Sequence, residues 1–180
     1  MRRSLFAMTA VALAVAGCSS TGDSIGRFGL SNPAATERYL ATATATDAFE
    51  IQAAELALSQ AQRPDVRAYA QRLINEHNRS LRGMSEAAYE AGTTPPEAIP
   101  TGAQQRLLGA LQGAPAGTFD ETYLRQEIDA HEDASKLHRA YALTGGAEPL
   151  RRAAALAHAR VIQHREDARR LRRVTMAEPS

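Results

Sequence analysis

Hydrophobic and small residues recur every three to four positions along most of the chain, and this spacing predicts helices rather than strands. The clearest run lies near the C-terminus, where core positions are separated by alternating steps of four and three residues: Leu150, Ala154, Ala157, Val161, His164, Ala168 and Leu171. Such spacing is typical of a helix that packs against other helices along one face. No stretch shows the two-residue alternation that marks a β-strand.

Breaks in this pattern divide the chain into four long helices and one short helix. Proline suits the first turn of a helix, and the cluster Pro95, Pro96 and Pro100 requires a loop. The pattern therefore predicts long helices over residues 34–62, 64–91, 119–145 and 148–174, and a short helix over residues 104–111. This arrangement predicts an all-α fold, an up-down four-helix bundle over residues 34–176, with the short extra helix in the connection between the second and third long helices and a tail at residues 177–180.

Four ionisable residues occupy positions of the expected core, one on each long helix: Glu50, His77, His131 and His164. Burial of polar groups without partners is costly, so this pattern requires an explanation. One explanation is a single metal ion, because three imidazoles and a carboxylate suit Zn, Fe, Cu or Mn. Metal-bound histidines usually donate their other N–H to an oxygen, and we expect Asp120 and Glu127 to supply such oxygens.

The same four residues also allow a core without metal. Glu50 could accept hydrogen bonds from two imidazoles and form a closed polar network that fixes the register of the helices. A carboxylate-bridged di-iron centre is disfavoured, because it needs Glu-x-x-His pairs and the residues three before the histidines are Ile74, Ile128 and Val161. No haem-attachment, phosphate-loop or hydrolase motif is found, so an enzyme is the less favoured interpretation.

The N-terminal residues have the pattern of a lipoprotein export signal. Two arginines precede a short apolar run, which ends in Val15-Ala16-Gly17-Cys18 and resembles the lipobox of bacterial lipoproteins. We therefore expect residues 1–17 to be a signal peptide, and residues 18–33 to be a lipidated Cys18 with a flexible tether. Ser19 after the cysteine resembles the signal for delivery to the outer membrane, facing the periplasm. An ordinary secretory signal with an unused cysteine is the alternative.

Charge and cysteine content narrow the possible partners. The formal net charge of +1 includes Arg2 and Arg3, and their removal with the signal peptide leaves 19 basic and 20 acidic side chains. A nucleic-acid partner is therefore not expected. Cys18 is the only cysteine, so no disulfide can form within the chain. The expected partners are the membrane, through Cys18, and a metal ion.

Six short motifs occur in a fixed order along the predicted bundle. They are Phe49-Glu50-Ile51, Ala68-Tyr69-Ala70-Gln71-Arg72, Glu76-His77, Phe119-Asp120 with Tyr123, Ala130-His131 and Gln163-His164. Together they resemble the bacterial ferritin-like domain-of-unknown-function 4142 family over roughly residues 49–168. The resemblance implies an exported, ferritin-like four-helix bundle whose polar motif positions include the four candidate ligands. Relatives often carry a proline before the last histidine, and this chain has none there.

These features together predict a lipid-anchored protein of the cell envelope that binds one divalent metal ion in its core. Storage, stress defence and sensing are the roles that such binding would serve. The alternative is a non-catalytic structural or interaction lipoprotein whose Glu/His cluster is a metal-free polar network.

Replacement of Cys18 tests the lipid anchor. The thiol is the atom expected to carry the lipid, so Cys18→Ala should leave an unlipidated precursor that keeps residues 1–17. Labelling with a radioactive fatty acid and the intact mass of the protein from bacterial cells measure both effects. Ser19→Ala is the matched control and should remain labelled. Equal labelling of the Cys18 variant and the original protein would contradict lipidation at this residue.

Overall fold

The computed structural model describes residues 32–177, which form five α-helices and no strand. The helices are α1 (Pro33–Gln60), α2 (Pro64–Glu90), α3 (Gly102–Gln112), α4 (Ala116–Thr144) and α5 (Glu148–Ala177). The all-helical class is thus confirmed, with helix ends within a few residues of those expected. Cys18, the expected signal peptide, nearly all of the tether and residues 178–180 lie outside the described residues.

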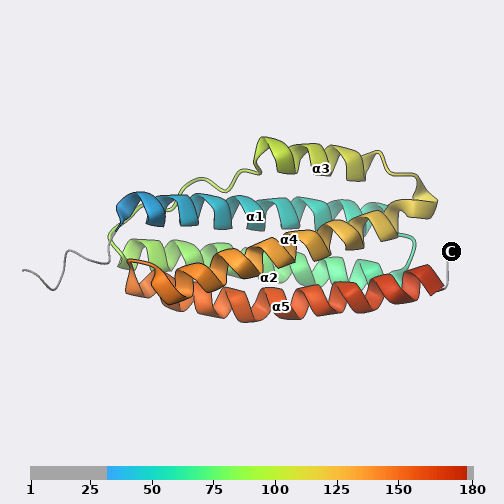
Figure 1. The fold of residues 1–180 in the computed structure, drawn as a ribbon. Helices are drawn as coiled ribbons and strands as arrows, with labels where there is room; N and C mark the ends of the chain where they lie inside the picture. Colours follow the sequence, from blue (N-terminus) through green and yellow to red (C-terminus); the bar gives the residue numbers. More distant parts are fainter. Residues whose placement is uncertain (1–31, 178–180) are drawn as a thin grey trace, which may run out of the picture.

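The four long helices lie side by side, as Figure 1 shows, with α3 on the outside of the group. Helix α1 packs against α2 and α4, and α5 packs against the same two helices. This leaves one interior that all four long helices share. Helix α3 packs against α1 and α4 and is the expected short helix between the second and third long ones. None of the helices within residues 32–177 is both long and apolar enough to cross a membrane.

Local sequence fixes the ends of several helices. The Asn32 side chain accepts a hydrogen bond from the first turn of α1, and Thr101 and Gln104 form a reciprocal capping box at the start of α3. Gly92 follows the end of α2, and its φ of 72° lies in the left-handed region that favours glycine. The Thr93 N–H then bonds back to the Ala88 carbonyl oxygen at 3.0 Å and closes the helix end.

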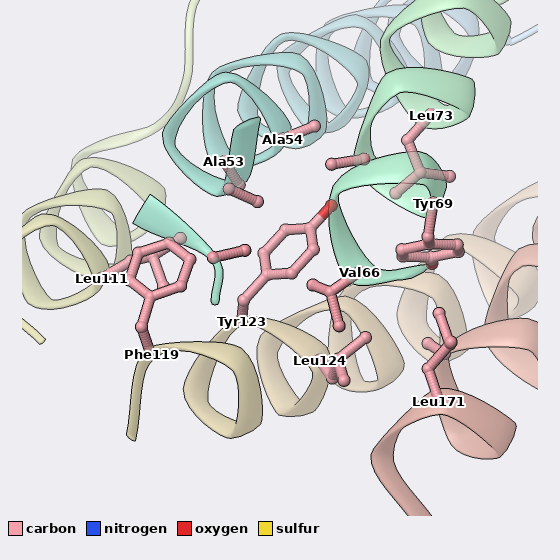
Figure 2. Close-up of a cluster of buried hydrophobic side chains, with 14 of the residues drawn as sticks. Ala53, Ala54, Val66, Tyr69, Leu73, Leu111, Phe119, Tyr123, Leu124 and Leu171 are labelled. Carbon is pink, nitrogen blue, oxygen red and sulfur yellow. The ribbon is translucent and has the colours of Figure 1, made fainter. Parts of the chain in front are cut away.

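Two groups of buried apolar side chains fill the interior, one towards each end of the long helices. The first lies where α1 turns into α2 and includes Val66, Tyr69, Phe119, Tyr123 and Leu124 (Figure 2). The second lies at the opposite end and includes Tyr39, Leu40, Met84, Tyr141 and Leu150. Along every long helix, the buried histidines and glutamates fall between these two groups. The fold therefore encloses a polar layer between two apolar ones.

The turn between α1 and α2 is fixed by a carboxylate from α4. Asp120 is buried, and its two carboxylate oxygens accept hydrogen bonds from the backbone N–H groups of Gln62 and Arg63 at 3.0 and 2.9 Å. These N–H groups lie in the turn directly before α2, and Asp120 supplies a buried acceptor for both of them. Asp120 therefore works as a cap supplied by another helix.

Loss of this cap should destabilise the fold. Asp120→Ala leaves two part-buried N–H groups without their acceptor, and we expect the free energy of unfolding to fall by about 2 kcal/mol. Urea unfolding followed by circular dichroism measures the change. Asp129→Ala, an exposed position on the same helix, is the control and should stay close to the original value. Equal effects of both substitutions would contradict the capping role.

Candidate metal centre

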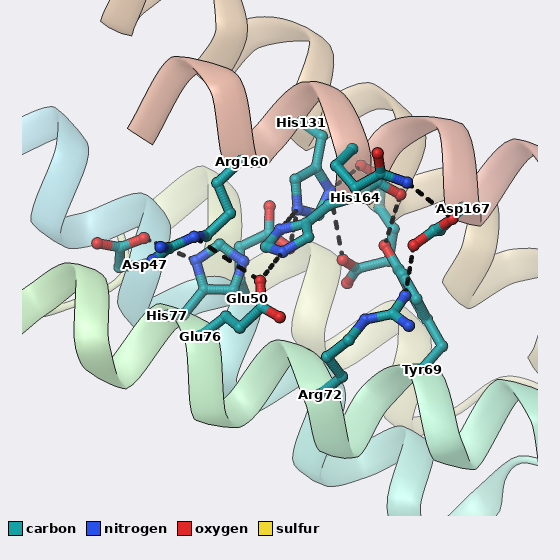
Figure 3. A network of polar contacts seen from close by, with 12 residues as sticks. Asp47, Glu50, Tyr69, Arg72, Glu76, His77, His131, Arg160, His164 and Asp167 are labelled. Carbon is teal, nitrogen blue, oxygen red and sulfur yellow. Dashed lines mark hydrogen bonds and ion pairs between the residues drawn. The ribbon is translucent and has the colours of Figure 1, made fainter. Parts of the chain in front are cut away.

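A cluster of histidines and carboxylates occupies the middle of the interior, with contributions from all four long helices (Figure 3). Every member except Glu76 is buried, and Glu76 is half-buried. The members are Asp47 and Glu50 from α1, Glu76 and His77 from α2, Glu127 and His131 from α4, and His164 from α5. The helical period turns these positions inward, and the apolar layers above and below exclude water from them.

Three imidazoles converge at the centre of this cluster. The ring centroids of His77, His131 and His164 are 5.1–5.6 Å apart in all three pairs. One ring nitrogen from each lies within 4.8 Å of the others. Convergent nitrogens from three helices can hold one cation, because each imidazole offers a lone pair when that nitrogen is unprotonated.

Two of the imidazoles are oriented by carboxylates on neighbouring helices. His77 Nδ1 donates to Asp47 Oδ1 at 2.7 Å, and His164 Nε2 donates to Glu76 Oε2 at 2.6 Å. Partial burial disfavours the charge of Glu76, but its bond to His164 and the charges of His164, Arg160 and Arg72 outweigh that effect and lower its pKa. An ionised carboxylate only accepts hydrogen bonds, so each bond places a proton on the outer nitrogen.

The third imidazole is oriented within its own helix. His131 Nδ1 donates to the backbone carbonyl oxygen of Glu127 at 2.7 Å. Its inner atom, Nε2, then lies 3.2 Å from Nδ1 of His164. Both of these nitrogens are acceptors, because the outer nitrogen of each ring carries the proton. His77 Nε2 is buried and has no hydrogen-bond partner. The two facing acceptor nitrogens of His131 and His164 repel each other, and the inner nitrogen of His77 has no partner. A proton or a cation shared between these three nitrogens would satisfy them.

The pKa values of two imidazoles favour the neutral form that binds metal. Burial, followed by the charges of His77 and His164, lowers the pKa of His131 well below its usual range. Burial and the charge of His77 lower the pKa of His164 to about 4. For His77, burial disfavours protonation, but the hydrogen bond and charge of Asp47 outweigh it and raise the pKa. Metal binding would therefore displace a proton from His77.

Two glutamates lie beside the imidazoles. Glu50 Oε2 is 3.7 Å from His131 Nε2, and Glu127 Oε2 is 3.6 Å from His131 Nδ1. Both side chains are fully buried, and the two carboxyl groups lie within hydrogen-bonding reach of each other but have no other hydrogen-bond partner. Burial raises the pKa of Glu127 to about 7. Burial, and then the charge of Glu127, raises the pKa of Glu50 well above its ordinary value.

The structure brings together three of the residues expected as ligands, His77, His131 and His164, while Glu50 lies beside His131 in a second group with Glu127. Asp120 does not join them: it caps the turn before α2, and its eleven-residue separation from His131 corresponds to about 16 Å of helix. The carboxylate near His131 comes from four residues earlier rather than three. This spacing differs from the Glu-x-x-His pairs of di-iron centres.

Two residues of the cluster were not expected from the sequence. Asp47 lies three residues before Glu50 among small residues, and Glu76 directly precedes His77. Both acidic residues lie close to candidate ligands in the sequence, and this proximity was the signal that could have identified them. His138 and His158 lie outside the cluster, where His138 is buried against the Tyr39 hydroxyl and half-buried His158 lies 3.3 Å from Ser135 Oγ.

Most of the chain resembles a known protein family. The model of the family described as domain of unknown function DUF4142 matches residues 29–171, which is most of the chain. The chain belongs to this family. No curated protein sequence matches the DUF4142 chain significantly.

A solved structure supports the fold of this DUF4142 protein. The crystal structure of a DUF305 fragment from Deinococcus radiodurans superposes with a TM-score of 0.66 at 18% sequence identity. The match covers 83% of this chain and 99% of the fragment. At this identity the likeness shows a shared helical fold alone.

The titration of Glu127 should make the stability of the metal-free protein depend on pH. A folded-state pKa raised from 4.5 to about 7 stabilises the fold below pH 4.5, and this stabilisation is lost as the pH rises through 7. Glu127→Gln keeps the neutral form at every pH. Between pH 4.5 and 8, the unfolding free energy of the variant should therefore rise by about 3 kcal/mol relative to the original protein.

Urea unfolding in the presence of a chelator measures this difference at each pH. The histidines titrate in both proteins, so their contributions largely cancel in the comparison. Glu132→Gln, an exposed position on the same helix, is the control and should show no such trend. A difference that stays constant with pH would mean that Glu127 titrates normally.

Proposed function

We propose that this protein is a ferritin-like, lipid-anchored protein of the cell envelope that binds one divalent transition-metal ion in its core. The ligands are His77, His131, His164 and Glu50. The observation that carries the proposal is the orientation of the three imidazoles: each outer nitrogen donates to an oxygen, and each inner nitrogen turns towards the other two. This is the arrangement that metal-bound histidines adopt in proteins.

The donor set indicates which ions fit. Three imidazoles with one carboxylate suit Zn²⁺, Fe²⁺, Mn²⁺ or Cu²⁺. Among the described residues, the thioether of Met84 lies in the apolar group at the end of the bundle, and Met176 is exposed. Neither contributes sulfur to the cluster, so the proposed site disfavours Cu⁺. A fully buried set of ligands fits sequestration or sensing of the ion better than turnover of a bulky substrate.

The anchor and the location are part of the same proposal. Cys18 carries the lipid, and the tether holds the bundle at the outer membrane on its periplasmic side. The support is the lipobox-like sequence before Cys18 and the serine after it.

A metal-free polar network is the second candidate, and one observation favours it. Burial raises the pKa values of Glu50 and Glu127, so protons could occupy the cluster in place of a cation. In that case the cluster would fix the helix register only.

Removal of His131 distinguishes the two candidates. The purified full-length protein should contain about one metal ion per chain, and Zn²⁺ added back after a chelator has removed this ion should raise the Tm by roughly 5–10 °C, since a ligand bound only by the native state stabilises it. His131→Ala should lose both the bound metal and the Tm shift. Elemental analysis and thermal unfolding are the measurements.

The matched control is His158→Ala, which removes a half-buried histidine outside the cluster and should keep both properties. No bound metal, together with a Tm that ignores Zn²⁺, Fe²⁺, Mn²⁺ and Cu²⁺, would leave the polar network as the function of the cluster. Metal that survives His131→Ala would refute the ligand set.

A further inference from the structure

The carboxylate side of the cluster has donor atoms that one ion cannot use. Ligand atoms of Glu50, Glu127 and His131 lie within 4.8 Å of one another, and they form a second group beside the three imidazoles. His131 belongs to both groups, so the two groups are adjacent and share this residue. The two buried glutamates have no hydrogen-bond partner except each other, so their carboxyl groups must hold either a proton or a cation between them.

A tyrosine hydroxyl adds an independent observation. Tyr123 is fully buried, and its hydroxyl oxygen also lacks a hydrogen-bond partner. It lies one helical turn before Glu127 on α4, and Figure 2 shows its ring reaching from α4 towards α1 and α2. The two glutamates and this tyrosine bring five buried oxygens to one part of the interior, where the charges of Glu127 and Glu50 act on the Tyr123 hydroxyl.

The charges around these oxygens are not balanced by arginine. Arg72 and Arg165 both act electrostatically on the cluster, but Arg72 pairs with Asp167 at 2.6 Å and Arg165 with Glu166 at 3.3 Å. Asp47 and Glu76 bring the carboxylates of the cluster to four, and one divalent ion balances the charge of only two of them. Buried charges without compensation are costly, and a second cation would balance the others.

We propose that Glu50 and Glu127 hold a second divalent cation beside the imidazole-bound ion, with Glu50 shared between the two and Tyr123 on the far side. This inference rests on the proposed metal-binding function and extends it to a dinuclear centre whose two metal sites have different ligands. The first site is rich in nitrogen ligands and suits Zn²⁺, whereas the second has mainly oxygen ligands and suits a harder ion such as Mn²⁺ or Fe²⁺. Its ligands differ from the Glu-x-x-His pairs of di-iron bundles.

Sequential loading tests the second site. The metal-free, full-length protein is given one equivalent of Zn²⁺ and then titrated with Mn²⁺, whose free concentration is read from its electron paramagnetic resonance signal. We expect about one Mn²⁺ bound per zinc-loaded chain. Glu127→Gln should lose this Mn²⁺ and keep the Zn²⁺, and Tyr123→Phe should weaken Mn²⁺ binding without changing Zn²⁺ content. Glu132→Gln, exposed on the same helix, should bind both ions.

The outcomes separate the two proposals. If one Zn²⁺ binds and Mn²⁺ does not, the dinuclear centre is refuted and the single-ion function stands. Retention of Mn²⁺ by a folded Glu127→Gln variant would likewise refute the second site as assigned. A chain that binds neither ion refutes the proposed function itself. Circular dichroism of each variant establishes that lost binding is not lost folding.

Discussion

The hydrogen bonds on the outer nitrogens of the three central histidines govern the interior of this protein. Each bond fixes a tautomer and turns the second nitrogen of the ring towards the middle of the bundle. Two of them also cross between helices, from His77 to α1 and from His164 to α2. The contacts that orient the candidate ligands therefore also hold α1, α2 and α5 in register. Loss of one carboxylate would disturb both the chemistry and the packing.

The apolar layers on either side strengthen the electrostatic interactions within this polar layer. Side chains such as Phe49 and Leu73 on one side and Met84 and Leu150 on the other shield the cluster from water. In such surroundings electrostatic effects are stronger than at a surface. Burial is accordingly the largest cause of the raised pKa of Glu127 and the lowered pKa values of His131 and His164. Burial thus favours the neutral forms of His131, His164 and Glu127 in this layer.

The fold by itself does not specify this chemistry. The DUF305 fragment shares the helical architecture at 18% identity, and a shared architecture can carry unrelated sites. Particular atoms distinguish this interior instead: three convergent nitrogens, and two buried glutamates that have no hydrogen-bond partner except each other. These atoms come from four different helices, and the packing of those helices brings them together.

The sequence alone determined the helices and most of the cluster. A period of three to four residues places Glu50, His77, His131 and His164 on inward faces whatever the neighbouring helices do. It also places Glu127 one turn from His131, because both lie on one helix. Proline and glycine mark the helix ends through backbone geometry, which is likewise local.

Only the tertiary structure decided which carboxylate meets which histidine. Asp47 reaches His77 and Glu76 reaches His164 because of the relative rotation and axial register of separate helices, which the period within one helix does not encode. The same register carries Asp120 to the turn before α2, three helical turns away from His131. Spacing along a helix predicts which side chains face the interior, whereas contacts between helices depend on packing of the whole bundle.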